Sequence, residues 1–146
     1  MILPVTLTIA AALAVVNLWL AFRIVPTRLR DKVLVGDNGD VRLHARMRAQ
    51  ANLVEYAPFV LILLALIELG GGSPMGLWIL GMAFVIARIL HGFGMDRLQS
   101  NPLRAGGALA TWVILAVLAG WALAMAYGAR EAGLPGTLVV TPVAHA

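Results

Sequence analysis

The apolar residues of this chain lie in four long runs that are separated by short polar or glycine-rich segments. These runs predict helices at about residues 2–23, 46–69, 75–96 and 103–128. A helix needs about 20 apolar residues to cross a hydrocarbon core of roughly 30 Å, and each run is long enough to do so. The pattern therefore predicts an all-α integral membrane protein, a four-helix bundle in one domain.

The segments outside the runs indicate how these helices connect. Residues 70–74 (Gly-Gly-Gly-Ser-Pro) break the second run, and a link this short predicts that the second and third helices are antiparallel neighbours. The first run begins without basic residues, which favours a retained span over a cleaved signal peptide. Residues 130–146 contain several glycines and prolines, which predicts an irregular tail.

The composition supports a membrane protein and excludes some kinds of chemistry. The chain is 61% hydrophobic and only 12% charged, about half the charge that a soluble domain usually carries. It has no cysteine, so disulfides, thiolate metal sites and a cysteine nucleophile are excluded. Residues 36–40 (Gly-Asp-Asn-Gly-Asp) lack the spacing and the closing Glu of an EF-hand, so they predict a turn and no metal site.

The basic residues predict the orientation of the chain in the membrane. Seven of them lie in the first connection and its flanks: Arg23, Arg28, Arg30, Lys32, Arg42, Arg46 and Arg48. The second connection has none, and the third has Arg97 and Arg104. By the positive-inside rule the first and third connections are cytoplasmic, and both termini lie on the opposite side. No nucleic-acid binding is predicted, because the basic loop lacks interleaved aromatic residues.

Two of the spans carry ionisable residues that need an explanation. Arg48, Asn52 and Glu55 share one face of the second span, and Arg88 and His91 share one face of the third. An ionisable side chain in the centre of a spanning helix costs about 2.5–3.5 kcal/mol. We therefore expect both stripes to face inward, where Glu55 can pair with an arginine and Asn52 can bridge the polar groups of the two stripes. Such a cluster can hold helices together or serve a function, and the residues alone leave both open.

The arginines favour an anionic ligand over a cationic one. Arg48 lies near the cytoplasmic start of the second span, and Arg104 lies near the start of the fourth, on the same side. A guanidinium group pairs with carboxylates through two parallel hydrogen bonds. A cavity between these helices would therefore bind a carboxylate-bearing molecule.

Two segments together resemble a known family. Residues 48–59 (RAQANLVEYAPF) contain the pattern R-A-x-x-N-x-x-E, and residues 87–94 (ARILHGFG) contain R-x-x-H. These motifs, in the second and third spans, resemble those of the MAPEG superfamily, the membrane-associated proteins in eicosanoid and glutathione metabolism. The resemblance covers roughly residues 1–128 and is strongest to the bacterial inner-membrane branch.

The resemblance implies a homotrimer that binds glutathione between neighbouring subunits at the cytoplasmic side. By position, glutathione contacts are implied for Arg48, Gln50, Asn52, Glu55, Tyr56, Arg88 and His91. Arg104 matches the arginine that stabilises the glutathione thiolate in eicosanoid-forming members. The chain departs from those members at Met95, where they often have Tyr, and at Ala105, where some have Ser.

Several functions follow from these observations as hypotheses. The leading one is a glutathione-dependent transferase or peroxidase in a bacterial inner membrane, which uses glutathione as co-substrate on lipophilic electrophiles from the bilayer. A glutathione-binding protein without turnover and a structural membrane protein of the same fold remain as alternatives. A small multidrug transporter is disfavoured, because such proteins rely on a carboxylate in the first span and this chain has none there.

Overall fold

The computed structural model describes residues 2–97 and 99–131, which form four long helices and one short helix. The helices are α1 (Pro4–Phe22), α2 (Val25–Asp31), α3 (Val41–Leu69), α4 (Pro74–Met95) and α5 (Pro102–Glu131). By length and composition, four helices can cross a membrane, and the described residues contain no strand. This confirms the all-α, four-span prediction. Most of the predicted irregular tail lies outside the described residues, and its first two residues belong to α5.

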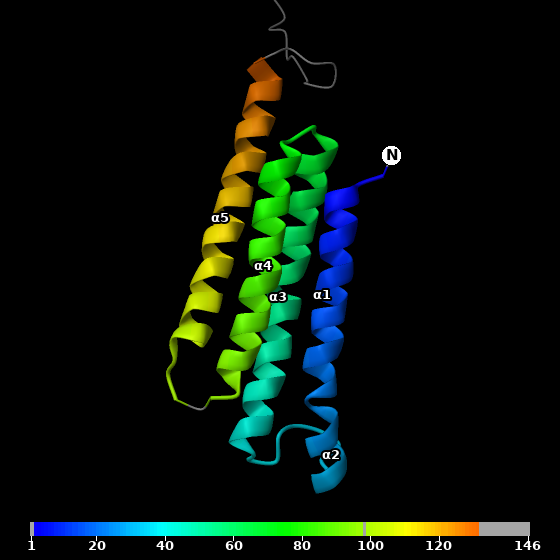
Figure 1. Cartoon of the computed structure of the whole chain (residues 1–146), viewed down its shortest axis with the longest axis vertical. Helices are drawn as coiled ribbons and strands as arrows, with labels where there is room; N and C mark the ends of the chain where they lie inside the picture. Colours follow the sequence, from blue (N-terminus) through cyan, green and yellow to red (C-terminus); the bar gives the residue numbers. More distant parts are fainter. Residues whose placement is uncertain (1, 98, 132–146) are drawn as a thin grey trace, which may run out of the picture.

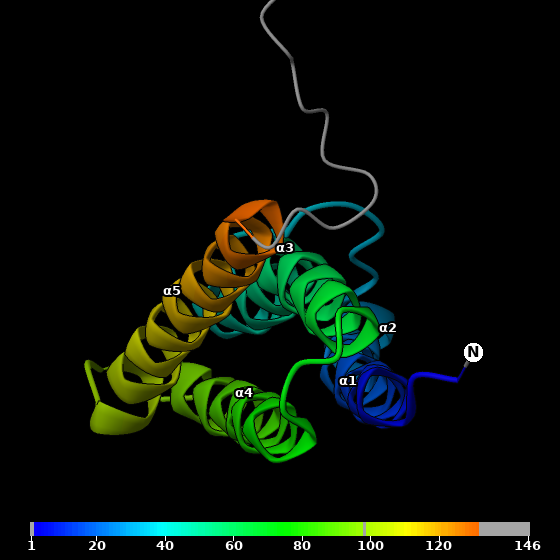
Figure 2. The same cartoon turned by 90° about the horizontal axis from the view of Figure 1, so that it is seen from above.

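The four long helices lie side by side along the long axis of the molecule (Figure 1). One end of this bundle, called the basic end below, contains the end of α1, all of α2, the start of α3, the end of α4 and the start of α5. α4 packs against α1, α3 and α5. Seen from above, α1 and α5 lie on opposite sides of the bundle (Figure 2).

The bundle is apolar both inside and outside. The core contains fully buried side chains from each of the four long helices, such as Ile9, Leu64, Phe84 and Leu118. Many other large apolar side chains are exposed on the outer surface of the bundle, including Leu18, Phe59, Ile79 and Val113. A water-soluble bundle has polar residues on that outer surface, so the observed pattern fits a lipid environment.

The structure differs from the predicted spans at the basic end. α3 begins at Val41, five residues before the predicted start, because the Asp40 side chain accepts hydrogen bonds from the backbone N–H groups of Arg42 and Leu43. The short helix α2 was not predicted, and it ends at Lys32, which adopts a left-handed conformation. Both differences lie outside the apolar runs. Hydropathy does not indicate where a helix begins or ends there, and local hydrogen bonds determine these boundaries.

At the opposite end, Glu68 joins the end of α3 to the start of α1. Its carboxylate oxygens accept hydrogen bonds from the backbone N–H groups of Val5 and Thr6, at 2.9 and 2.8 Å, and from the Thr6 hydroxyl at 2.7 Å. Leu3, the residue before α1, offers no capping side chain. The carboxylate of a distant residue therefore satisfies the free N–H groups of this helix.

Candidate functional site

A cavity of about 410 Å³ opens at the basic end between α3, α4 and α5. Its polar lining consists of His44, Arg48, Asn52, His91, Arg97 and Arg104. No carboxylate lines it among the described residues. Its volume falls within the range of small-molecule sites, and its arginines favour an anionic occupant.

The α3 side of the cavity comes from the stripe that the sequence indicated. Arg48 and Asn52 line the cavity, and the Arg48 guanidinium lies 3.6 Å from a Glu55 carboxylate oxygen. The Arg48 and Glu55 side chains are about half exposed, at 52% and 51%. The prediction that this whole stripe faces inward is therefore wrong for these two residues in the single chain. On a helix both are rotated by about 40–60° from Asn52, away from the buried Ala49 and Leu53.

Arg88, on α4, is bonded to α3 and α5 and holds the three helices together. Its side chain is buried, as predicted, and donates hydrogen bonds to the Asn52 side-chain oxygen on α3 and to the Gly107 carbonyl on α5. Its guanidinium carbon lies 5.6 Å from the centre of the Phe84 ring. Arg88 does not line the cavity, so within this chain it orients Asn52.

His91 and Arg104 approach each other where α4 meets α5. The His91 Nδ1 atom lies 3.1 Å from the Arg104 carbonyl oxygen. A carbonyl oxygen can only accept, so Nδ1 carries a proton in this contact. The Asn101 side chain fixes the start of α5, because it accepts from the Arg104 N–H at 3.0 Å and donates to the Gly94 carbonyl at 2.9 Å.

Two glycines allow this close approach of α4 and α5. A Cβ atom on Gly107 would lie 2.7 Å from the Ala87 carbonyl oxygen and 2.7 Å from the His91 Cβ. A Cβ atom on Gly94 would overlap the backbone of Arg104. The backbones of the two helices are therefore in contact beside the cavity, and this contact places His91 against the start of α5.

Two residues for which the resemblance implies glutathione contacts, Gln50 and Tyr56, lie outside the cavity lining of this chain. Gln50 faces α1, where its amide nitrogen lies 3.4 Å from the Asn17 side-chain oxygen. The Tyr56 hydroxyl accepts a hydrogen bond of 3.0 Å from the Trp112 indole on α5. Neither lines the cavity. The structure thus gathers Arg48, Asn52, His91 and Arg104 around the cavity, with Glu55 attached through Arg48, and leaves Gln50, Tyr56 and Arg88 outside its lining.

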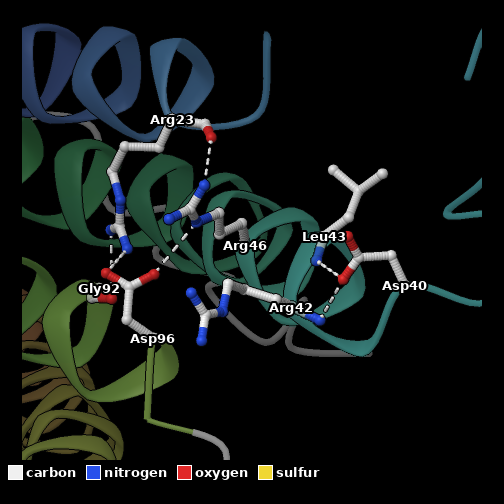
Figure 3. A network of polar contacts seen from close by, with 7 residues as sticks. All are labelled: Arg23, Asp40, Arg42, Leu43, Arg46, Gly92 and Asp96. Carbon is white, nitrogen blue, oxygen red and sulfur yellow. Dashed lines mark hydrogen bonds and ion pairs between the residues drawn. The ribbon is translucent and has the colours of Figure 1, made fainter. Parts of the chain in front are cut away.

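Sequence reasoning missed a network of polar contacts at the basic end (Figure 3). Asp96, which follows α4, forms ion pairs with Arg23 at the end of α1 and with Arg46 on α3. Arg46 also donates to the Arg23 carbonyl at 3.0 Å, and Arg23 donates to the Gly92 carbonyl at 3.2 Å. Three helices are therefore tied together at the residue before Arg97. One signal in the sequence could have indicated this network. Asp96 follows the third span, at the same end of the bundle as the basic first connection.

The Asp96 network should make the stability of the protein depend on acid pH. Burial would raise the pKa of Asp96, but hydrogen bonds from Arg23 and Arg46 and their charges hold this pKa below the usual carboxyl range. The stabilisation is therefore complete above about pH 5 and is lost as the pH falls below about 3.9, the ordinary pKa of Asp. We expect Asp96→Asn to lower the melting temperature at pH 7, and this difference from wild type to shrink as the pH falls below the ordinary pKa of Asp toward the lowered pKa of Asp96. A difference that is constant with pH would contradict the role of the carboxylate.

The comparisons with known proteins agree with the fold. A model of the MAPEG family matches residues 6–124, which include every residue that lines the cavity. Inner membrane protein YecN of Escherichia coli (strain K12) is 29% identical to this chain over 98 residues, which cover 67% of this chain and 74% of the relative. Inner membrane protein YecN of Escherichia coli O6:H1 (strain CFT073) matches with the same values.

Proposed function

Because this chain belongs to the MAPEG family, we propose that it is a membrane-bound glutathione-dependent transferase or peroxidase that acts on lipophilic electrophiles. The single observation that carries the proposal is the cavity at the basic end, where Arg48, Asn52, His91 and Arg104 come together from three helices. Membership of the family supports glutathione as the co-substrate, and the four apolar helices support a reaction at the bilayer.

The charges around the cavity suit those of glutathione. This tripeptide carries two carboxylates, one amino group and one thiol. Arg48 can bind a carboxylate through its guanidinium, and Glu55, which lies beside it, can bind the amino group. Asn52, held by Arg88, offers an oriented amide to the peptide groups. An α-amino acid head group therefore fits the Arg48–Glu55 pair as a unit.

Arg104 supports the chemical step. A free cysteine thiol titrates near about 8.5, so only a few per cent is thiolate at neutral pH. A neighbouring cation lowers the pKa of the bound thiol, and the Arg104 guanidinium can provide this charge at the cavity wall. The thiolate sulfur then attacks an electrophilic carbon or a peroxide oxygen of the lipophilic substrate, and the leaving group departs with the electron pair.

We propose further that the site is completed in a homotrimer in an inner membrane. Arg48 and Glu55 are half exposed on the face of a spanning helix, and charged groups there are costly against lipid. A neighbouring subunit would cover this pair and enclose glutathione between the subunits. The similarity to E. coli inner membrane proteins supports the location, and the positive-inside rule supports a cytoplasmic basic end.

Binding of glutathione to the purified protein in detergent tests the proposal. We expect Arg48→Ala to weaken binding by about 10–100-fold, because hydrogen bonds to a charged group contribute about 1.5–3 kcal/mol. The matched control is Arg42→Ala, which removes an exposed arginine that lies on the same helix outside the cavity. Absence of glutathione binding to the wild-type oligomer would exclude the proposed function.

Met95 favours one second candidate, a glutathione-binding protein without turnover. This residue lines the cavity where related enzymes often have Tyr, and a thioether cannot donate a hydrogen bond to the sulfur. Mass spectrometry of products after incubation with several electrophiles and a hydroperoxide separates the two candidates. Glutathione binding without any conjugate or reduced product would favour the binding protein.

A further inference from the structure

Asp37 and His44 form a polar pair that has no role in the proposed function. The His44 Nδ1 atom lies 2.6 Å from an Asp37 carboxylate oxygen, and His44 lines the cavity. We propose that His44 is the general base that removes the proton of the glutathione thiol, and that Asp37 is the residue that orients it. This proposal rests on the proposed function, and it adds a proton acceptor to the thiolate stabilisation assigned to Arg104.

The position of His44 on α3 brings it to the cavity wall. His44, Arg48 and Asn52 follow one another at intervals of four residues, so they share one face of the helix. All three line the cavity, as Arg104 does from α5. A cavity of this volume holds one small molecule, so the imidazole and a thiol beside Arg104 face the same ligand. The proton can pass to the ring directly or through one water molecule.

The turn before α3 holds the Asp37 carboxylate against this imidazole ring. Gly39 has a φ of +78°, which glycine adopts at little cost and which lets the chain turn. The other Asp37 carboxylate oxygen accepts from the Gly39 N–H at 3.0 Å, and the Asp37 carbonyl accepts from the Asp40 N–H at 2.9 Å. Asp40 in turn accepts from the N–H groups of Arg42 and Leu43 (Figure 3). The carboxylate is therefore attached to the first turn of the helix that carries the ring.

An ionised carboxylate suits His44 to accept a proton. Hydrogen bonds from the Gly39 N–H and the His44 ring hold the pKa of Asp37 below the usual carboxyl range, so Asp37 is an anion at neutral pH. A carboxylate can only accept, so Nδ1 carries a proton, and in the neutral ring Nε2 is the acceptor. When Nε2 takes the thiol proton, the carboxylate stabilises the imidazolium that forms. The electron pair of the S–H bond stays on sulfur, and the proton later leaves to water, to which the His44 side chain is 59% exposed.

His91, the other histidine that lines the cavity, is less suited to this role. Its Nδ1 contacts the Arg104 carbonyl, which is a neutral group. It also lies near the charges of Arg88 and Arg104, so a second proton on its ring would place like charges together. In the described part of the chain, Asp37 is the carboxylate that is bonded to a histidine of the cavity.

The thiolate forms before any electrophile is needed, so glutathione alone tests the proposal. Stopped-flow ultraviolet absorbance, recorded after the protein in detergent is mixed with glutathione, gives the rate at which thiolate appears and its final amount. We expect His44→Gln to slow this rate by about 100-fold, because a general base contributes about 10²–10⁴-fold, and to leave the final amount within about twofold of wild type. Asp37→Asn should slow the rate to a smaller extent. Arg104→Ala should instead lower the final amount.

Rescue by added imidazole separates a base from a structural residue. His44→Ala should regain rate in proportion to the imidazole concentration, because the small molecule can enter the space of the lost ring and accept the proton. Imidazole should not restore Arg104→Ala, which lacks the stabilising charge. Arg42→Gln changes an exposed side chain of α3 outside the cavity and should match wild type in both rate and amount.

Either of two results would overturn the role of His44 and leave the proposed function in place. His44→Gln could form thiolate at the wild-type rate, or imidazole could fail to restore a folded His44→Ala protein that still binds glutathione. A titration of wild type with glutathione, done first, identifies the remaining case. Without binding, the proposed function and the role of His44 both fail.

Discussion

Gly107→Ala should unfold at a clearly lower temperature than wild type, whereas Gly106→Ala, one residue earlier in the same helix, should be at least as stable. A methyl group at residue 107 would press on the Ala87 carbonyl and on the backbone and Cβ of His91, which cannot rotate away. Overpacking of this kind costs about 1–3 kcal/mol. A methyl group at residue 106 meets nothing within 4 Å, and alanine stabilises a helix interior by up to about 1 kcal/mol relative to glycine.

Thermal unfolding in detergent, followed by circular dichroism, measures this difference, and a glutathione titration on the folded variants adds a functional measurement. Separation of α4 from α5 should also weaken glutathione binding, because His91 and Arg104 then no longer share one wall of the cavity. Equal stability of the two variants would contradict the close contact of these helices.

Arg104→Ala should lower the turnover number by about 100-fold or more while it weakens glutathione binding by far less. The reason is that Arg104 stabilises the thiolate charge in the proposed mechanism, and removal of one such electrostatic contact typically costs about 10²–10³ in rate. The variant should regain rate as the pH rises toward about 8.5, where an unassisted thiol ionises. Ultraviolet absorbance of the bound thiolate, measured against pH together with the conjugation rate, tests both statements.

Arg104→Lys and Arg42→Ala serve as controls for this experiment. Arg104→Lys keeps a cation at the same backbone position and should retain much of the thiolate signal, and Arg42→Ala should retain all of it. A variant without Arg104 that keeps the wild-type rate and pH profile would assign thiolate stabilisation to another group.

The sequence was sufficient for the membrane fold and for the family. Whether a helix can span a bilayer depends on the length and hydropathy of one segment, so no knowledge of its neighbours was needed. The two motifs in the second and third spans were likewise local, and the family model confirms the resemblance. Spacing also showed correctly that Arg88 and His91 are buried together.

Helix spacing shows which residues share a face, but it does not show which neighbour that face meets. Gln50 lies two residues from both Arg48 and Asn52 and contacts α1, whereas those two residues line the cavity. Arg88 shares a face with His91, yet its guanidinium is used by Asn52 and Gly107. These outcomes depend on contacts between helices that are far apart in the sequence.

The sequence by itself determined four spanning helices, their family and a basic end, because hydropathy and charge act along the chain. The tertiary structure alone decided which polar residues form the cavity. It tied the end of α4 to two other helices through Asp96, and it brought α5 against α4 at two glycines. The physical reason is that an ion pair or a backbone contact needs two partners, and only the packing of the helices specifies the second one.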